Sequence, residues 1–572
     1  MNERYMKWLN EPRIDKDTYE ALKAMDEASV EDAFYKHLSF GTGGMRGIVG
    51  PGTNRMNIYT VRRAIYAYAQ YLLETNHNAA SHGVVVAHDN RHMSDDFARE
   101  AVGVLNAFGI KSYLFDALRP TPELSFAVRH HGAVGGIMVT ASHNPPEYNG
   151  VKMYDAAGCQ LTPERADRVI DFFNDVSDIF AIESIDLERA KKSGLVEMIG
   201  ESTDAAYVKA VKGVTSSVDS NKTIKAVFTP LHGASRTLGP RILREAGFEV
   251  VTVDKQMTPD PDFSTVDSPN PESKAAFQAA IQTGQANGAD LLIATDPDGD
   301  RLAIMPMSDG EYHFLTGNQT GAIFIDYLLK KRSEAGTLPK RGIVYNTIVT
   351  SDFGATIATS YGMDVISTLT GFKFIGEQMA KIENTDTEFL FGYEESYGYV
   401  IKDIVRDKDS LQAALLACEI ADALKREGKT FVDYLNALYE CHGYYGDRLM
   451  NVVLKGQAGE TMINNIMTHF RNAEFASLEG NVRIAKEDYL HSTRVTSEGT
   501  KTLDYPQSNV LKFTFENDVW FTLRPSGTEP KLKIYLNAKT SSKQATDALL
   551  DAMEKILSDE IEFVQNKKGV KQ

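Results

Sequence analysis

Three aspartates stand at alternate positions directly after the apolar run DLLIAT: Asp296, Asp298 and Asp300. In an extended backbone, alternate side chains lie on the same side, so this spacing predicts that three carboxylates converge. Such a concentration of like charge is costly unless a cation neutralises it. Because every donor is an oxygen atom, the pattern predicts a hard divalent cation, either Mg²⁺ or Ca²⁺.

The loop does not fit an EF-hand, because its sixth position is Arg301 rather than glycine and its twelfth is Met307 rather than glutamate. Three carboxylates leave coordination positions open, which favours Mg²⁺ with phosphate oxygens as its partners. The alternative is an acidic surface turn. Pro297 and Gly299 stiffen and sharpen the loop, which a surface turn does not require, so we predict a metal site.

A second polar loop, VTASHNPPEYNGVK at residues 139–152, follows the apolar run GGIMV. Ser142 lies just beyond the predicted strand, and two prolines stiffen the loop behind it. A hydrolase pair of Ser142 and His143 is not favoured, because neighbouring side chains rarely face each other and the chain has no G-x-S-x-G elbow. Ser142 either caps the following turn or carries a phosphoryl group whose oxygens would reach a divalent ion.

The chain has 572 residues, which suggests about four domains, and its formal net charge is −17. The acidic balance argues against a nucleic-acid or anionic-membrane surface, although basic residues can gather around a small anionic substrate. Three scattered cysteines do not make a disulfide framework or a zinc site. No stretch approaches the roughly 18 apolar residues of a membrane helix, and the start has no apolar signal segment. We expect a cytoplasmic enzyme with no nucleic-acid or membrane partner.

Short apolar runs typical of strands alternate with amphipathic helical segments such as 95–109 and 239–248, which predicts α/β domains. In open α/β sheets, ligands gather at the carboxyl ends of the strands. Each predicted strand here ends in a polar loop with glycine or proline, so we expect one α/β plan to be used more than once. The predicted strands are 83–89, 135–141, 224–230, 289–295, 341–347 and 387–393.

The pattern changes after a predicted helix at 409–427. The segments 440–456 and 509–539 have the appearance of antiparallel strands, and a helical segment follows at 545–560. The C-terminal part is therefore predicted to be an α+β domain with an antiparallel sheet.

Several motifs together resemble the α-D-phosphohexomutase superfamily, the phosphoglucomutases and phosphomannomutases, and most closely its bacterial phosphoglucomutases. The resemblance covers almost the whole chain in the family's order. It implies three related mixed α/β domains and a C-terminal α+β domain around a central cleft, which we place at 1–200, 201–315, 316–440 and 441–572. The motifs are FGTGGMRG (40–47), TASHNPPEYNGVK (140–152), ATDPDGDR (294–301), TLTGFKFIG (368–376), GYEESYG (392–398) and RPSGTEPKLKIY (524–535).

The resemblance implies that Ser142 is the phosphoserine and that it completes a metal site with the three aspartates Asp296, Asp298 and Asp300. Lys152 and Arg46 match family positions near the phosphoserine, and His143 is a rival proton carrier. A lysine in a crowded cationic pocket can have its pKa lowered toward neutrality and act as a base. Arg91 either supports the charge balance of the site or lies on the surface.

Further matches imply a substrate site between two phosphate-binding ends. Arg524, Ser526, Gly527 and Thr528 offer a guanidinium fork, hydroxyls and backbone N–H groups for a distal phosphate, although an ordinary Pro-Ser-Gly turn is the alternative. The other residues implied to bind substrate are Glu394 and Ser396 for sugar hydroxyls, Thr370 and Lys373 for sugar selection, and Arg301 for charge balance.

The implied reaction interconverts α-D-glucose 1-phosphate and glucose 6-phosphate through phospho-Ser142 and a glucose 1,6-bisphosphate intermediate. It requires one Mg²⁺ ion and glucose 1,6-bisphosphate as primer, with a sugar phosphate as the only partner of a monomer or homodimer. Tyr393 stands where many members have glycine, which keeps phosphomannomutase and phosphopentomutase as alternatives. A metal-dependent phosphatase is a further alternative on the same scaffold.

Overall fold

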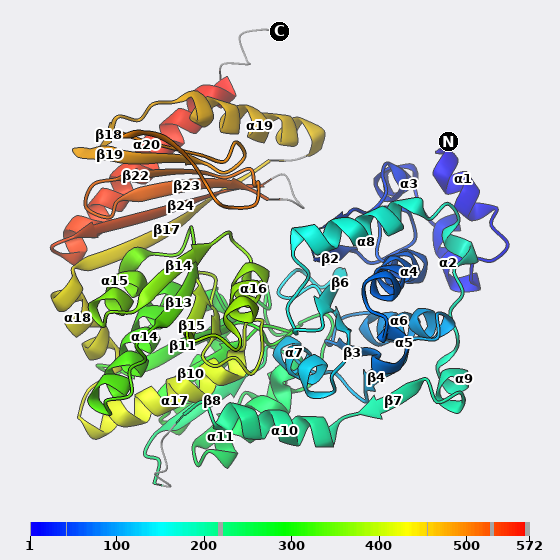
Figure 1. Ribbon diagram of the computed structural model, residues 1–572, viewed down its shortest axis with the longest axis horizontal. Helices are drawn as coiled ribbons and strands as arrows, with labels where there is room; N and C mark the ends of the chain where they lie inside the picture. The colour runs from blue at the N-terminus through cyan, green and yellow to red at the C-terminus, as the bar shows by residue number, and fades with distance from the viewer. Residues whose placement is uncertain (1, 42, 216–220, 455, 527–530, 567–572) are drawn as a thin grey trace. The chain divides into compact units, whose positions relative to one another are not determined.

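The computed structural model describes residues 2–41, 43–215, 221–454, 456–526 and 531–566 (Figure 1). They form two compact units. The first consists of Met1–Gly317 and Gly371–Phe431, and the second of Asn318–Thr370 and Val432–Gln572. The chain therefore leaves the first unit after Gly317, returns at Gly371 and leaves it again after Phe431.

The first unit begins with three short helices: α1 (Glu3–Leu9), α2 (Lys16–Lys23) and α3 (Glu27–Phe34). A seven-stranded mixed sheet follows in the order β1–β2–β6–β5–β3–β4–β7. The pairs β5–β3, β3–β4 and β4–β7 are parallel, whereas β1–β2, β2–β6 and β6–β5 are antiparallel. The strands are β1 (Phe40–Gly41), β2 (Gly44–Ile48), β3 (Val84–His88), β4 (Ser112–Phe115), β5 (Gly135–Val139), β6 (Tyr148–Asp155) and β7 (Val196–Ile199).

Helices cover both faces of this sheet, and its strands β3, β4 and β5 are buried at every position. Along β3, Val84 and Val86 belong to one core cluster, and Val85 and Ala87 to another. This alternation follows from the two-residue period of a strand. The first cluster includes residues of α4 (Ile58–Thr75), α6 (Ser94–Ala107) and α8 (Pro163–Asp175), and the second includes residues of α7 (Thr121–His130). The remaining helices here are α5 (Ala79–His82), η1 (Ile179–Ala181) and α9 (Leu187–Lys192).

A five-stranded sheet follows in the first unit, in the order β12–β11–β10–β8–β9. Strand β10 pairs in parallel with β8 and antiparallel with β11, so the sheet is mixed. The strands are β8 (Lys225–Thr229), β9 (Glu249–Thr252), β10 (Leu291–Thr295), β11 (Leu302–Ser308) and β12 (Glu311–Tyr312). Its helices are α10 (Glu201–Lys212), η2 (Ala234–Arg236), α11 (Leu238–Glu245), α12 (Asp254–Met257), η3 (Lys274–Phe277) and α13 (Gln278–Asn287).

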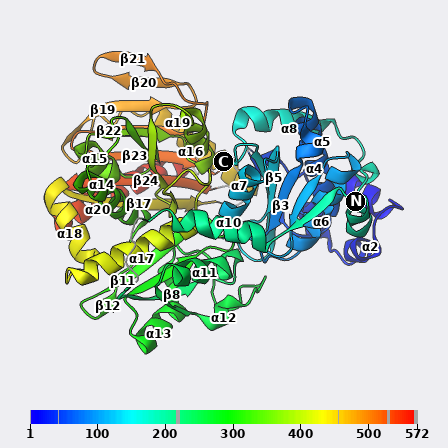
Figure 2. The same ribbon diagram turned by 60° about the horizontal axis from the view of Figure 1, so that its bottom comes forward.

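The returning segment of the first unit contains helix α16 (Phe372–Ile382), the antiparallel strands β15 (Glu388–Glu394) and β16 (Gly398–Val400), and helix α17 (Ser410–Arg426). Figure 2 shows α17 alongside α10 and α11, with which it is in contact. The returning segment is therefore packed against the part of the chain that carries the aspartate loop.

The second unit contains a parallel pair of strands, β13 (Gly342–Thr347) and β14 (Asp364–Thr368), with helices α14 (Gly317–Glu334), α15 (Asp352–Ser360) and α18 (Phe431–His442). Its C-terminal part is an eight-stranded antiparallel sheet with β18 at one side of β19. Helices α19 (Gly456–Asn472) and α20 (Lys543–Asn566) share one core cluster with this sheet. The strands are β17 (Tyr444–Val453), β18 (Ser477–Leu478), β19 (Asn481–Asp488), β20 (Thr493–Thr496), β21 (Gly499–Thr502), β22 (Leu511–Phe515), β23 (Trp520–Pro525) and β24 (Lys531–Thr540).

These elements confirm the predicted α/β strands, each within a few residues of its expected position, and the antiparallel C-terminal sheet with its helices. Among the described residues, no helix has the length and apolar character that crossing a membrane requires. The strands β18–β21 and helix α19 were not predicted. No position of β20 or β21 is buried, which leaves little apolar pattern in these two strands.

The core of the C-terminal sheet gives a prediction for stability. Phe521 is fully buried, and its ring stacks on that of Phe513 with centroids 4.7 Å apart. Replacing it with alanine should lower the free energy of unfolding of the second unit by about 3–5 kcal/mol, because a large cavity would remain. Urea unfolding followed by circular dichroism measures this loss.

The matched control is Val453→Ala on β17, where the side chain is 66% exposed. We expect a change within about 0.5 kcal/mol, as for most surface substitutions. Equal losses in the two variants would contradict the assigned core.

Candidate functional site

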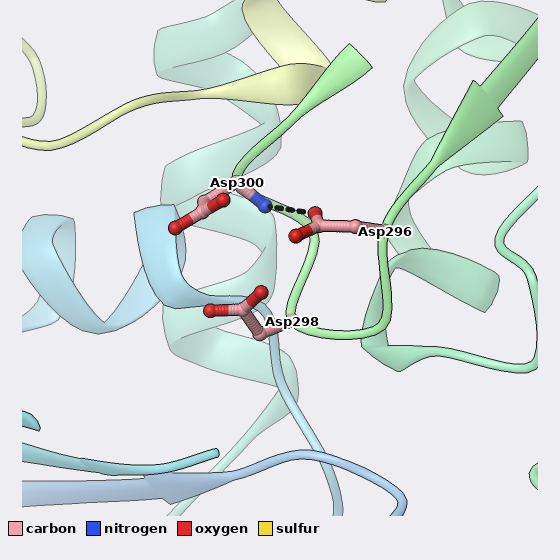
Figure 3. A group of neighbouring side chains, drawn as sticks. All are labelled: Asp296, Asp298 and Asp300. Carbon is pink, nitrogen blue, oxygen red and sulfur yellow. Dashed lines mark hydrogen bonds between the residues drawn. The ribbon is translucent and has the colours of Figure 1, made fainter. Parts of the chain in front are cut away.

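The three aspartates predicted to converge do so at the end of β10. The carboxylates of Asp296, Asp298 and Asp300 all face one space (Figure 3), with ligand oxygens within 4.8 Å of one another. All three are buried. At this separation each pair of like charges costs about 3 kcal/mol at an effective dielectric constant of 20, so positive charge must offset them.

The loop is held in shape by its own hydrogen bonds. Asp296 Oδ1 accepts from the backbone N–H groups of Asp300, at 3.0 Å, and Arg301, at 2.9 Å. Gly299 has a φ of 69° and lies so close to Pro120 that a Cβ would be 2.8 Å from the proline Cβ. The glycine is therefore required both by the turn and by the close approach.

Two carboxylate oxygens of this cluster fit a metal ion. Asp298 Oδ1 and Asp300 Oδ1 are buried and accept no hydrogen bond from the residues that the structure describes. A buried carboxylate oxygen without a partner is costly, and a hard cation would satisfy both atoms at once. The donor set therefore suits a divalent ion such as Mg²⁺.

Ser142 lies beside this cluster. It follows β5 by three residues, and its hydroxyl donates to Asp296 Oδ2 at 2.8 Å. Its backbone has a φ of 52°, in the left-handed region that L-residues rarely adopt, and its N–H donates to Thr140 Oγ1 at 2.8 Å. This conformation costs about 1–2 kcal/mol, and strain of this kind concentrates at functional sites.

The expectation that Ser142 and His143 do not face each other is wrong. His143 Nδ1 lies 3.2 Å from Ser142 Oγ. The left-handed turn at Ser142 brings the two neighbouring side chains to one side, which an extended backbone would prevent. The serine hydroxyl thus has a carboxylate and an imidazole within hydrogen-bond distance.

Arg91 is the residue that fixes the serine loop. It is only 3% exposed, so the surface role considered for it is wrong. Its guanidinium donates to four backbone carbonyl oxygens of one loop, those of Ser142, Asn144, Pro145 and Tyr148. Five N–H donors on a planar fork make this possible, and no other side chain could reproduce it.

Two lysines supply positive charge to the aspartates. Lys152 on β6 donates from Nζ to Asp298 Oδ2 at 2.7 Å and to Asp300 Oδ2 at 3.1 Å. Lys408 Nζ lies 3.0 Å from Asp300 Oδ2 and 3.0 Å from Asp407 Oδ1. These ion pairs offset part of the negative charge of the three carboxylates.

The lowered pKa expected for Lys152 is wrong in this environment. Burial acts to lower the pKa of Lys152, but Asp298 and Asp300 outweigh it and raise the pKa. Burial and the neighbouring carboxylates raise the pKa of Asp296 well above its usual value. The pocket around Lys152 is anionic rather than cationic, and this reverses the direction of the shift.

Lys408 and Asp407 belong to the site but were not predicted from the sequence. They stand in the charged run VRDKDS, which resembles a solvated loop, yet both are buried. Asp407 also accepts from the Tyr154 hydroxyl at 2.8 Å, which ties this loop to β6. The available signal was the position of the run directly before the helix predicted at 409–427, which the structure shows as the buried helix α17.

The predicted residues Arg46 and Arg301 have partners near the same site. Arg46 lies on β2 opposite Gly150 and donates to Asn144 Oδ1 at 2.9 Å. Gly44 precedes it because a Cβ there would collide with the Val151 carbonyl. Arg301 pairs with Glu272, and its charge also acts on Asp300 and Asp296.

The predicted sugar loop lies beside the aspartate loop within the first unit. Gly398 forms a β-bridge with Arg301, and Lys408 packs directly on Gly398. Glu394 at the end of β15 is 4% exposed, and its Oε1 accepts from the Gly371 N–H at 2.8 Å. Ser396 and Lys373 are partly exposed in the same unit.

Tyr393, the departure from the family pattern, is a core residue. It is 1% exposed and packs on Phe391 with ring centroids 5.5 Å apart. Because side chains alternate along β15, it lies on the face opposite to Glu394.

The other predicted substrate residues lie elsewhere. Thr370, Arg524 and Ser526 belong to the second unit, and their part in the site stays a prediction. Gly527 and Thr528 lie outside the described residues.

Comparison with known proteins first gives the class. Four family models match in order, the α/β/α domains I, II and III and the C-terminal domain of phosphoglucomutase/phosphomannomutase, at residues 37–179, 205–308, 316–442 and 449–555. The predicted fold class is thereby confirmed: a four-domain enzyme with mixed α/β sheets and an antiparallel C-terminal sheet. The chain belongs to the phosphoglucomutase/phosphomannomutase family of isomerases.

Within this family, the chain is similar to individual phosphoglucomutases. The phosphoglucomutase of Staphylococcus saprophyticus is 36% identical over 547 residues, which cover 95% of this chain and 97% of that protein. The phosphoglucomutase of Staphylococcus aureus is 36% identical over 512 residues, 89% of this chain and 91% of that protein. The crystal structure of the Paramecium phosphoprotein pp63/parafusin, a phosphoglucomutase, has a TM-score of 0.67 at 18% identity and covers 93% of this chain and 96% of that one.

The aspartate cluster gives a prediction for metal binding. Asp298→Asn should weaken binding of Mn²⁺, used as a probe for Mg²⁺, by at least about tenfold, because one anionic ligand is lost. Isothermal titration calorimetry measures the affinity. Asp309→Asn makes the same change in an exposed turn after β11 and should leave it unchanged. Similar affinities in the two variants would refute the metal site.

The contacts of Arg91 predict a rigid serine loop. Arg91→Lys keeps the charge but cannot donate to four carbonyl oxygens, so amide exchange across 142–148 should become at least about tenfold faster. Hydrogen–deuterium exchange with mass spectrometry measures this rate. Arg99→Lys is the control, since Arg99 is exposed on α6 and pairs only with Asp95 among the described residues. Unchanged exchange in Arg91→Lys would show that other contacts hold the loop.

Proposed function

We propose that this chain is a phosphoglucomutase that interconverts α-D-glucose 1-phosphate and glucose 6-phosphate. The observation that carries this proposal is the hydrogen bond from the Ser142 hydroxyl to Asp296 within a buried cluster of three carboxylates. The 36% identity to phosphoglucomutases over most of the chain supports the choice of glucose.

In the proposed reaction Ser142 carries a phosphoryl group. The free hydroxyl of the sugar phosphate attacks this phosphorus and a new P–O bond forms. The bond to Ser142 Oγ breaks, the hydroxyl proton passes to a base, and the leaving Ser142 oxygen takes up a proton from an acid. The product is glucose 1,6-bisphosphate. Its other phosphoryl group then returns to Ser142 by the same exchange in reverse, so atoms and charge balance over the cycle. Positioning of the reacting oxygens is most of what such a transfer needs.

The proposed role of each residue in this reaction follows from its contacts. Arg91 holds the serine loop through its carbonyl oxygens, so the phosphoryl group is presented in one place. Asp296, Asp298 and Asp300 would hold one Mg²⁺ ion together with a phosphoserine oxygen. When bound, the ion supplies positive charge to the phosphoryl oxygens. Lys152 and Lys408 add further positive charge at Asp298 and Asp300.

The proton carrier is proposed to be one of Lys152, Arg46 and His143. His143 Nδ1 lies 3.2 Å from Ser142 Oγ, within hydrogen-bond distance. The Asp298 and Asp300 carboxylates raise the pKa of Lys152, which favours it as an acid or a charge partner over a base.

The remaining assignments belong to the same proposal. Glucose 1,6-bisphosphate primes the enzyme, the protein is cytoplasmic, and it is a monomer or homodimer. We keep domain boundaries near residues 200, 315 and 440. The proposed substrate residues are Glu394, Ser396, Thr370, Lys373, Arg301, Arg524, Ser526, Gly527 and Thr528.

A coupled assay from glucose 1-phosphate, with and without glucose 1,6-bisphosphate and Mg²⁺, tests the proposal. Ser142→Ala should lower kcat by at least about a thousandfold, because the covalent carrier is lost. It should also remove the phosphoryl group seen by intact mass. Ser193→Ala, at the end of α9, should change neither measurement.

Parallel assays with mannose 1-phosphate and ribose 1-phosphate test the sugar. If either compound is turned over faster than glucose 1-phosphate, its sugar and not glucose is the preferred substrate. Release of inorganic phosphate in place of sugar phosphate would indicate a phosphatase, and full activity of Ser142→Ala would end the phosphoserine mechanism.

A further inference from the structure

A basic pocket lies in the N-terminal part of the first unit, among residues that the proposed reaction does not use. Its volume is about 260 Å³. Four basic side chains line it, together with Trp8 and Phe180: Arg4, Lys7, His37 and Arg63. They come from α1, the segment before β1 and α4, and no predicted site residue lies on these elements.

The positive charge of this pocket is not offset by the carboxylates that the structure describes. No aspartate or glutamate is among its described lining residues. Within the same described part of the chain, Arg4, Lys7 and Arg63 form no ion pair, in a protein whose net charge is −17. Glu3 is the acidic residue nearest to Arg4 and Lys7 on α1, but it forms no ion pair with either among the described residues. Glu11 and Asp178 are held by Arg13 at 2.6 Å and 2.9 Å, and the charge of Lys7 also lowers the pKa of Glu11.

The two arginines are fixed by carbonyl oxygens rather than by acids. Arg4 Nη1 donates to the carbonyls of Phe34 and Tyr35 at the end of α3. Arg63 Nε donates to the Phe173 carbonyl at 2.8 Å, and its guanidinium lies 3.9 Å from the centre of the Phe173 ring. Carbonyl contacts position a guanidinium but leave its unit charge in place, so the charge remains available to an anion.

The titration of the pocket agrees with this arrangement. Burial lowers the pKa of Arg63, and no described acidic group acts in the opposite direction. Burial, and then Arg63, Arg4 and Lys7, lower the pKa of His37. A bound anion would reverse both effects, because it favours the protonated forms.

The walls and size of the pocket limit what it can hold. Trp8 makes edge contacts with the rings of Phe34, Tyr59 and Phe180, so the wall is rigid. Val176 and Ile179 add apolar surface. A volume slightly below that of ordinary ligand pockets excludes large cofactors and fits a small molecule with one strongly charged group.

We propose that this pocket is a second anion site, which binds the phosphate group of a small phosphorylated metabolite or inorganic phosphate, independently of Ser142. The guanidinium of Arg63 and the ammonium of Lys7 face the phosphate oxygens, and Trp8, Phe180 and Val176 contact any organic part.

The two tryptophans of the chain, Trp8 and Trp520, allow a local readout. Protein labelled with 5-fluorotryptophan gives two ¹⁹F resonances, and Trp520→Phe assigns them. Titration with inorganic phosphate should shift the Trp8 resonance saturably, and sodium chloride at equal ionic strength should not. Titration with phenyl phosphate distinguishes a phosphorylated metabolite from inorganic phosphate as the ligand. Tighter binding of phenyl phosphate than of inorganic phosphate indicates a phosphate ester, and equal binding indicates free phosphate.

Three variants make the test specific. Arg63→Gln should raise the Kd for phosphate at least about tenfold and Lys7→Gln about threefold, as expected for the loss of a charge-assisted contact. Lys7 is exposed, so its variant keeps the test valid if Arg63→Gln does not fold. Lys16→Gln, an exposed lysine on the neighbouring α2, should bind as the parent does.

The proposal is overturned by any one of three results: a Trp8 resonance that does not respond, a response that chloride reproduces, or equal affinities in Lys7→Gln and Lys16→Gln. None of these results bears on the Ser142 mechanism, which the mutase assay tests separately.

Discussion

Three buried carboxylates held within 4.8 Å of one another are the constraint on which the rest of the site depends. Left alone, they would repel each other, so the fold surrounds them with two lysines, a threonine hydroxyl and backbone N–H groups. These partners come from β6, α7 and the loop before α17, which are distant in the sequence. Two of the carboxylate oxygens accept no hydrogen bond from the described residues, so the cluster could hold a cation.

The loop that carries Ser142 is held rigidly beside this cluster of carboxylates. Ser142 occupies a strained left-handed conformation, which persists only where the surroundings fix it. Arg91 does so from outside the loop, because its donors are shared among four carbonyl oxygens. Phosphoryl transfer gains mostly from positioning, so a stiff carrier beside a fixed charge cluster is physically suited to it.

Much of this arrangement could be predicted from local pattern. The strands were predictable because apolar runs ended in polar loops. The convergence of Asp296, Asp298 and Asp300 was also predicted, but a turn at Gly299 brings the three together rather than the extended backbone that was assumed. Contacts between distant segments could not be predicted in this way. In the sequence, Lys408 has the appearance of a surface charge, but tertiary packing buries it beside Asp300. Tertiary packing also places Lys152 beside carboxylates, which raise its pKa and do not lower it as expected. The Ser142–His143 contact depends on one backbone angle that the sequence does not specify.

The route of the chain has a consequence for how the protein can be divided. Because the first unit is built from Met1–Gly317 and Gly371–Phe431, it is not encoded as one contiguous stretch. A truncation after Gly317 would keep every aspartate of the cluster but delete Lys408, β15 and helix α17, and so expose a buried helix-packing surface. A gene fragment that stops there would therefore keep Lys152 beside the acidic ligands but lose the second counter-charge, that of Lys408.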